Sequence, residues 1–262
     1  MSARPRPVAV VTGAGRGVGR RLAERLARRG YHVVATDIDE GAAMVTGAVV
    51  EGTGVRQDVR DPDSHDAVAA LATSQGPLEV WVNNAGVLAA GDAWDLEPAI
   101  VRRQVEVNLM GVIWGCNAAV RAMTTAGTSG TILNVASMSS LVAAPGIAAY
   151  GATKHGVLGY SLSLAGELQQ AGRPITVSAL CPDVIKSDMT DAVTAVPAAR
   201  MLFARGALLT VDEVAAAADQ MIAQPRLVRA LPGYLGVLTH LARPFPGVGL
   251  RVLAQIARWS KR

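Results

Sequence analysis

Short, continuously apolar runs alternate along the chain with longer segments whose apolar residues recur at helical spacing. A run without polar alternation is typical of a strand that is buried on both faces of a sheet. Six such strands are predicted, at 7–11, 32–37, 54–59, 78–86, 130–137 and 175–182. Helices are predicted between them, at 18–29, 40–50, 64–74, 98–123 and 150–170.

This alternation of strands and helices indicates one α/β fold. Each strand is followed by a helix that can cover the sheet, so the sheet is expected to be parallel. We therefore predict a single doubly wound Rossmann-type domain, with about seven strands in a parallel sheet and helices on both faces. No internal repeat, low-complexity segment or linker interrupts it before about residue 225.

The end of the chain has a different pattern. "RLVRALPG" (226–233) is compatible with a short seventh strand, and the residues after it read as two helices split at Pro244 and Pro246. The second helix would have one apolar face, made by Leu250, Leu253, Ile256 and Ala257. Residues 226–262 are thus expected to form a strand and helical extension of the domain that residues 1–225 build.

Composition narrows the class of protein. The 262 residues are 50% hydrophobic and 18% charged, which suits a folded domain with a sizeable core. Two cysteines give neither a disulfide framework nor a metal-ligand spacing, and they fit a reducing cytosol. No secretory signal and no membrane-spanning run is visible, so a cytoplasmic enzyme without a metal site is expected.

Charge is distributed unevenly. Asp219 is the last acidic residue, and seven Lys or Arg residues follow it. The first 219 residues hold 18 basic and 21 acidic side chains, so the net charge of +4 belongs to the tail. No basic patch with interleaved aromatics appears in the body, which argues against nucleic acid as a partner.

The segment "TGAGRGVG" (12–19) lies between the first strand and the first helix, where a dinucleotide-binding turn is found. Gly13 permits a tight turn, and Gly17 and Gly19 allow the backbone close to a pyrophosphate at the helix N-terminus. Asp37 ends the second strand, 18 residues after Gly19. A carboxylate there would accept hydrogen bonds from the adenosine ribose and repel a 2′-phosphate, so NAD is predicted over NADP, although Arg16 is an argument for NADP.

Tyr150 and Lys154 are four residues apart in "YGATK", so a helix places them on one face. An ammonium beside a phenol favours the phenolate and should lower the tyrosine pKa. The pair can therefore act as a general acid and base near neutral pH. Ser137 ends the fifth strand, 13 residues before Tyr150, although Ser139 and Ser140 lie close to it.

Together these segments resemble the classical short-chain dehydrogenase/reductase family. The matching pieces are TGAGRGVG, Asp37, Asp58 in "QDV", "NNAG" (83–86), Asn108 in "VNLMG", Ser137 and YGATK, in the family's order over about residues 8 to 190. The resemblance implies a catalytic tetrad. Its members would be Asn108, Ser137, Tyr150 and Lys154.

The resemblance also implies a role for each part. Tyr150 would exchange a proton with the substrate oxygen, which Ser137 would hydrogen-bond. Lys154 would hold the nicotinamide ribose and Asn108 a water relay, while Asp58 would bond the adenine. The full set of implied NAD-binding residues is Gly13, Arg16, Gly17, Val18, Gly19, Asp37, Asp58, Val59, Asn84, Ala85, Gly86, Tyr150, Lys154, Ile185 and Ser187. A homotetramer or dimer, paired through the helices that contain Asn108 and Tyr150, is implied as well.

The chain departs from the family's pattern after the sixth strand. There "CPDVIKSDM" has Asp183 where the family usually has glycine, and Ser187 where it usually has threonine. Ser187 can still bond a carboxamide, whereas Asp183 would alter either the turn or the substrate pocket. The usual final Asp-Gly-Gly is absent as well.

The sequence therefore predicts an NAD-dependent oxidoreductase that interconverts a secondary alcohol and a ketone, with a steroid, terpenoid or lipid-like substrate. The alternatives are an NADP-dependent carbonyl reductase and a catalytically silent NAD-binding regulator. For the C-terminal helices we favour a cover over the substrate cleft or a subunit contact. Peripheral contact of the basic helix with an anionic membrane is the other possibility.

Overall fold

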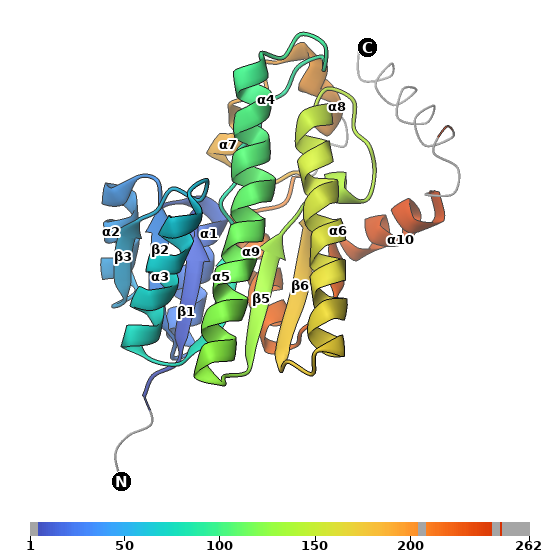
Figure 1. Ribbon diagram of the computed structural model, residues 1–262. Coiled ribbons are helices and arrows are strands. Elements are labelled where there is room, and N and C mark those ends of the chain that lie inside the picture. Colours follow the sequence, from blue (N-terminus) through green and yellow to red (C-terminus); the bar gives the residue numbers. More distant parts are fainter. Residues whose placement is uncertain (1–4, 204–207, 243–246, 248–262) are drawn as a thin grey trace.

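A computed structural model describes residues 5–203, 208–242 and 247. Its centre is a seven-stranded sheet with the order β3-β2-β1-β4-β5-β6-β7, in which every neighbouring pair is parallel (Figure 1). The strands are β1 (Val8–Thr12), β2 (His32–Asp37), β3 (Thr53–Arg56), β4 (Leu78–Asn83), β5 (Gly130–Val135), β6 (Ile175–Pro182) and β7 (Val228–Leu231). The predicted fold class is confirmed.

Helices cover both faces of this sheet. One layer holds α3 (Pro62–Gln75), α5 (Gly111–Ala126) and α6 (Ala148–Gln170), whose apolar sides share a buried cluster with alternate residues of the strands. The opposite layer holds α1 (Gly17–Arg28) and α9 (Val211–Ala223), which pack on each other and on the other side of the strands. Trp81, Leu22 and Ile132 are among the largest side chains with no exposed surface, so both clusters are dry cores.

The remaining elements lie at the two edges of the sheet and beyond the carboxyl ends of its strands. At the β3 edge, α2 (Glu40–Val49) packs on β2 and β3. The short helices α7 (Asp188–Asp191) and α8 (Arg200–Phe203) follow β6, and α10 (Gly233–Ala242) follows β7. In Figure 1, α10 extends away from the sheet.

The long helix predicted over 98–123 has three parts. It consists of α4 (Pro98–Val105), a π-helical turn at Glu106–Met110, and α5. A π-turn is uncommon and often marks a functional position in a helix. Periodicity alone cannot locate one extra residue in a helix, so the sequence gives no signal for this turn.

Three predicted strands are shorter than expected, and the helices α7, α8 and α9 were not predicted. The third, fourth and fifth strands end at Arg56, Asn83 and Val135, because the residues that follow turn away from the sheet into the cleft. Helix α9 was not predicted, although Thr210 and Glu213 form a capping box at its start.

The tail is partly as predicted. The seventh strand exists, and α10 corresponds to the first of the two predicted C-terminal helices. The second one, with Leu250 to Ala257, lies outside the described residues. Within the part of the chain that the structure describes, no helix has the length and apolarity needed to cross a bilayer.

Candidate active site

The glycine loop that joins β1 to α1 depends on close backbone packing. Gly13 has a left-handed φ of +63°, and a Cβ at Gly19 would collide with the carbonyl oxygen of Gly13 and the side-chain amide of Asn84. Only glycine is compatible with both requirements. The loop is therefore held in a single narrow turn at the N-terminus of α1, with backbone amides at its open end.

Asn84 fixes this loop from the end of β4. Its Nδ2 donates to the carbonyl oxygens of Thr12 at 2.9 Å and Gly13 at 3.0 Å, and its backbone N–H donates to Oγ1 of Thr12 at 3.0 Å. Ala85 N–H donates to the same hydroxyl at 3.1 Å. Thr12 begins the TGAGRGVG segment, but it was not predicted as a site residue. Its signal is a single polar residue at the end of an apolar strand, which many strands share.

Asp37 lies at the end of β2, directly beside the loop. One carboxylate oxygen accepts a hydrogen bond from Gly15 N–H at 2.9 Å, and the other accepts from Asp39 N–H at 3.1 Å. Arg16 is turned elsewhere, toward Asp188 of α7, with 3.3 Å between Nη1 and Oδ2. A negatively charged group of a ligand at this end of the cleft would thus face the carboxylate of Asp37, while Arg16 is paired with Asp188.

Asp58 follows β3 and is paired with Arg60. The guanidinium contacts both carboxylate oxygens, at 2.9 Å from Nε to Oδ1 and 2.5 Å from Nη2 to Oδ2. These hydrogen bonds hold the pKa of Asp58 below its ordinary range. An ionised carboxylate has about four acceptor positions, so Asp58 can still accept a bond from a ligand amino group.

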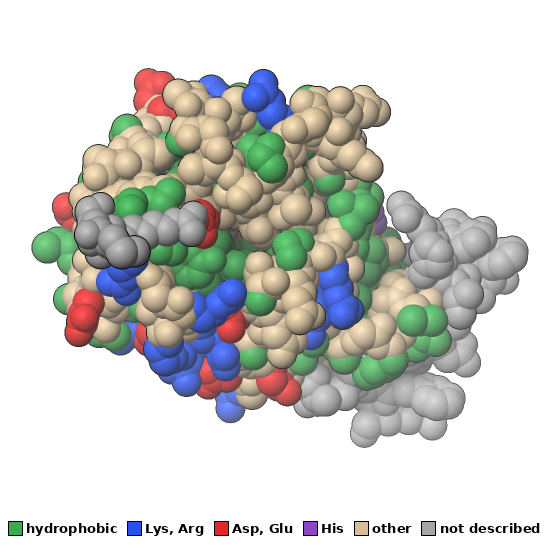
Figure 2. Space-filling model, turned by 90° about the horizontal axis from the view of Figure 1, so that it is seen from below, with side chains coloured by type: hydrophobic (Ala, Val, Ile, Leu, Met, Phe, Trp, Pro, Cys, Tyr) green, Lys and Arg blue, Asp and Glu red, His purple; other side chains and the backbone are tan. Residues whose placement is uncertain are grey.

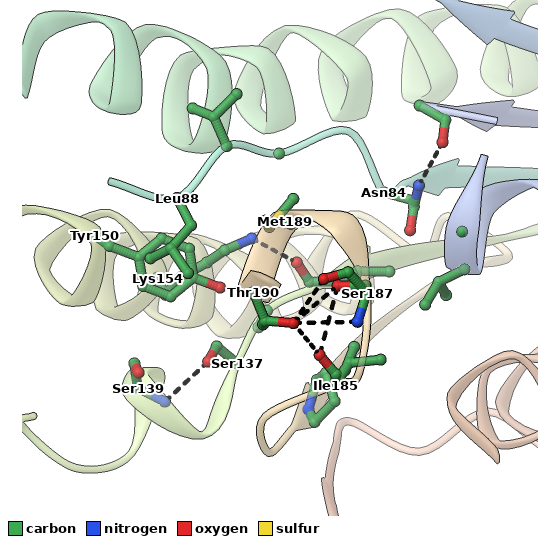
Figure 3. Close-up of a pocket in the computed structure, with 18 of the residues that line it drawn as sticks. Asn84, Leu88, Ser137, Ser139, Tyr150, Lys154, Ile185, Ser187, Met189 and Thr190 are labelled. Atoms are coloured by element: carbon green, nitrogen blue, oxygen red, sulfur yellow. Dashed lines mark hydrogen bonds between the residues drawn. The ribbon is translucent and has the colours of Figure 1, made fainter. Parts of the chain in front are cut away.

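Tyr150 and Lys154 lie on the first turns of α6 and reach the same space as Ser137 (Figure 3). The Lys154 Nζ donates to the carbonyl oxygen of Val135 at 2.9 Å and lies 5.7 Å from the centre of the Tyr150 ring. Lys154 is only 4% exposed. The Val135 carbonyl, which no sequence pattern could reveal, thus aims the ammonium at the tyrosine.

Burial controls the titration of both groups. It lowers the pKa of Lys154 to about 8, and it raises the pKa of Tyr150 above its ordinary value, with a hydrogen bond from Ser137 opposing that rise. The net shift of the Tyr150 pKa in the protein by itself is therefore upward and not the expected lowering, because desolvation of the phenolate outweighs the hydrogen bond with Ser137.

Ser137 caps a short 3₁₀ turn, Met138–Ser140, at the end of β5. Its Oγ accepts a hydrogen bond from Ser139 N–H at 3.1 Å, while the Ser140 Oγ accepts from Ser137 N–H at 3.3 Å. Ser140 is 2% exposed and serves this cap. Ser137 and Ser139 both line the cleft, and Ser137 is the one whose hydroxyl lowers the pKa of Tyr150, which favours it over Ser139.

Asn108 lies in the π-helical turn and has no exposed surface. Its amide forms a closed pair with the backbone of Val87, with Oδ1 accepting from N–H and Nδ2 donating to the carbonyl, both at 2.8 Å. Its Nδ2 also lies 3.4 Å from Oγ1 of Thr153. Asn108 holds the segment after β4 in place from behind. The water relay expected of it remains a prediction.

One cleft of about 900 Å³ joins these groups. Every predicted site residue lines it except Gly19 and Asn108, which lie behind the glycine loop and behind Val87. Its far end is mostly apolar. That end includes Val142, Ile147, Met189, Met201, Leu202 and Leu235.

Ile185 and Ser187 reach the cleft from the segment between β6 and α7. Ser187 begins α7 and shares a capping box with Thr190, whose Oγ1 also donates to the carbonyl of Ile185 at 2.6 Å. Thr190 was not predicted as a site residue, yet it fixes the turn that presents Ser187 (Figure 3).

Comparisons with known proteins show which family the chain resembles. Residues 7–197 match the family model for short chain dehydrogenases. The chain is 32% identical over 191 residues to a diacetyl reductase [(S)-acetoin forming] of Staphylococcus epidermidis, covering 71% of this chain and 74% of that protein. It is 35% identical over 195 residues to the 1-deoxy-11-beta-hydroxypentalenate dehydrogenase of Streptomyces exfoliatus, covering 71% and 70%.

A solved structure is similar over nearly the whole length. It is a short chain dehydrogenase/reductase from Burkholderia phymatum in complex with NAD, with a TM-score of 0.84, 29% identity, and coverage of 95% of this chain and 97% of that one. The chain belongs to the short-chain dehydrogenase family, as its motifs implied, and it is an oxidoreductase of that family.

Proposed function

We propose that the protein is an NAD-dependent oxidoreductase that interconverts a secondary alcohol and a ketone on an apolar substrate. The observation that carries this proposal is that Tyr150, Ser137 and Lys154 share one cleft with the glycine loop and Asp37. A proton-transfer group and a dinucleotide cradle are both needed for this chemistry, and neither is useful to it without the other.

The cradle fits NAD on the residues present. The turn at Gly13 and Gly19 leaves no room for a side chain, and no atom lies within 4 Å of a Cβ built at Gly17, so the backbone there is open to a pyrophosphate. Asp37 would hold the adenosine ribose, Asp58 and Val59 the adenine, and Ile185 and Ser187 the carboxamide. A bound nicotinamide would supply the hydride chemistry, between its ring and the carbon that carries the substrate oxygen.

The chain's own residues manage the proton. In oxidation the Tyr150 oxygen takes the hydroxyl proton of the alcohol, and in reduction it returns a proton to the ketone oxygen. Ser137 donates a hydrogen bond to that substrate oxygen, and the charge of Lys154 offsets the phenolate that forms on Tyr150. Asn108 keeps the wall behind Gly86 and Val87 in register with these groups.

The position of Asp37 supports NAD over NADP. Its carboxylate already accepts bonds from Gly15 and Asp39, so it is anchored where a 2′-phosphate would have to lie. Wild-type protein should bind NAD more tightly than NADP, and Asp37→Ala should narrow the gap by at least about tenfold. Titration of both nucleotides checks this. Tighter binding of NADP by the wild type would favour the alternative, a carbonyl reductase that uses NADP.

The substrate class rests on the apolar far end of the cleft, where Met189, Met201 and Leu235 are found. Turnover of a panel of steroid, terpenoid and fatty alcohols with NAD, followed by the absorbance of the reduced nicotinamide, tests the reaction and the substrate class together. The catalytically silent regulator predicts NAD binding with no turnover of any of them. A homotetramer or dimer in the cytoplasm completes the proposal, and sedimentation velocity measures the assembly.

A further inference from the structure

Helix α10 has two unlike sides. Its inner side packs on the edge of the sheet and on the cleft: Leu235 is 6% exposed, a Cβ at Gly236 would lie 2.6 Å from the Cβ of Ala230 on β7, and Thr239 lines the cleft beside Leu235. The helix is thus attached firmly to the end of the sheet. The inner side of α10 forms part of the cleft wall. It provides no evidence for a subunit contact or for a membrane contact.

The outer side of α10 is apolar as well. Val237 and Leu238 are 61% and 57% exposed, and Leu227, which precedes β7, is 51% exposed. A helix on a protein surface normally turns polar residues outward. The sequence of α10 contains neither Lys, Arg, Asp nor Glu. In Figure 2 hydrophobic side chains gather over this part of the molecule.

A second exposed apolar pair provides a comparison. On α2, at the opposite edge of the sheet, Met44 and Val45 are 58% and 53% exposed. Acidic residues surround that pair in sequence, namely Asp37, Asp39, Glu40 and Glu51. The sequence around α10 has the opposite charge: from residue 220 to 262 the chain has seven basic residues and no acidic one, and five of the seven lie outside the described residues.

We propose that the outer face of α10, made by Val237 and Leu238, docks on an anionic lipid surface. Apolar side chains on one face of a helix partition into the boundary between headgroups and acyl chains, and nearby basic residues add an attraction to anionic lipid. The charge of residues 220–262 is complementary to such a surface, whereas the acids around α2 would be repelled by it. Exposed apolar side chains on a helix coincide, in this part of the sequence, with a stretch that has basic but no acidic residues.

Docking through this face would bring the apolar end of the cleft close to the lipid, because Leu235 and Thr239 on the other side of the same helix line that end. This consequence rests on the proposed function, in which the substrate is apolar. The docking itself does not, because it is measured by binding and not by turnover.

The test uses the full chain and two kinds of vesicles, one of phosphatidylcholine alone and one that also contains phosphatidylserine. We expect flotation with the anionic vesicles at low salt, little with the neutral ones, and loss of binding at high salt, where charges are screened. The double variant Val237→Glu/Leu238→Glu should reduce the vesicle partition coefficient by at least about tenfold. The matched double variant Met44→Glu/Val45→Glu on α2 should leave it unchanged.

Both variants replace exposed side chains, and NAD titration and thermal melting verify that each is folded. The absence of binding to anionic vesicles at low salt would overturn the proposal, and so would an equal loss of binding in the α2 variant. If the α10 variant instead changed the sedimentation coefficient while the wild type ignored lipid, the face would be a contact between copies of the chain. If the wild type bound anionic vesicles but turned over none of the alcohols in the panel, only the proposed function would be contradicted.

Discussion

The two halves of the cleft are built in different ways. The half that faces β1 to β4, the cofactor half, is made of backbone turns tied together by hydrogen bonds, such as those from Asn84 to Thr12 and Gly13. The half beyond β6 is walled by side chains of the short helices α7 and α8 and of α10. A site made of backbone needs particular residues, while a wall of apolar side chains accepts many. The first half therefore defines the family, and the second is free to select a substrate.

The largest expected effect on activity comes from changing Tyr150, which lies between the two halves. Tyr150→Phe removes the phenol oxygen and keeps the ring, so alcohol oxidation should fall by at least about 10³-fold. The NAD dissociation constant should change little, because Lys154 remains anchored to Val135. Stopped-flow turnover and NAD titration measure the two. Activity within tenfold of the wild type would show that another group carries the proton.

The sequence could predict which residues lie in the cofactor half, while their part in binding NAD stays a prediction. Glycines at a strand-to-helix turn and an acid 18 residues further on are local patterns, and each has a local physical cause. Tyr150 and Lys154 could be paired because helical spacing alone brings them together. Each of these residues depends on near neighbours in the sequence.

Other parts of the site depend on contacts between distant segments, which the sequence of one chain does not reveal. The bond from Lys154 to the Val135 carbonyl joins α6 to β5, and the bonds of Asn108 to Val87 depend on a π-turn. The pKa of Tyr150 was expected in the wrong direction, because spacing shows which charges are near but not how deeply they are buried. Helix α9 was missed since its small apolar residues have a weak pattern, although its capping box was available.

A second prediction tests whether backbone packing controls the cofactor half. In Gly19→Ala the new methyl group would meet the Gly13 carbonyl and the Asn84 amide, so NAD affinity should fall by about 10² or more. Gly159→Ala on α6 is the control, because nothing lies within 4 Å of its Cβ. It should leave NAD binding unchanged and raise stability by about 0.5–1 kcal/mol. Isothermal titration and thermal melting measure both, and normal NAD binding by Gly19→Ala would contradict the close packing.

The pH dependence of the reaction tests the role of Tyr150, the proton-transfer group that lies between the two halves. Because burial raises the pKa of Tyr150, the deprotonated phenol is the minor form near neutral pH. The kcat/KM for alcohol oxidation should therefore rise with pH, by up to about tenfold per unit between about pH 6 and pH 8. Ketone reduction needs the protonated phenol and should stay nearly level over that range. An oxidation rate that fell as pH rose there would exclude this role for Tyr150.

The smallest effect is expected at Asp183, where the two halves meet. Its backbone N–H donates to the Leu231 carbonyl at 2.8 Å, so β7 already fixes this turn, and the residue itself lines the cleft. The family's glycine is therefore not required for the turn, and we expect the carboxylate to act on the substrate. Bringing an apolar substrate near a carboxylate removes water from the charge, which costs free energy.

Asp183→Gly and Asp183→Asn separate the two possibilities that the sequence left open. Asn keeps the size of the side chain and removes the charge, so if the charge matters, both variants should lower KM for apolar alcohols by about two- to fivefold. If the backbone matters, only the glycine variant should differ from the wild type, since it alone gains conformational freedom. In either case NAD affinity should change by less than about twofold. A similar loss of NAD affinity in both variants would place Asp183 in the cofactor half, and the division of the cleft drawn here would then be wrong at this residue.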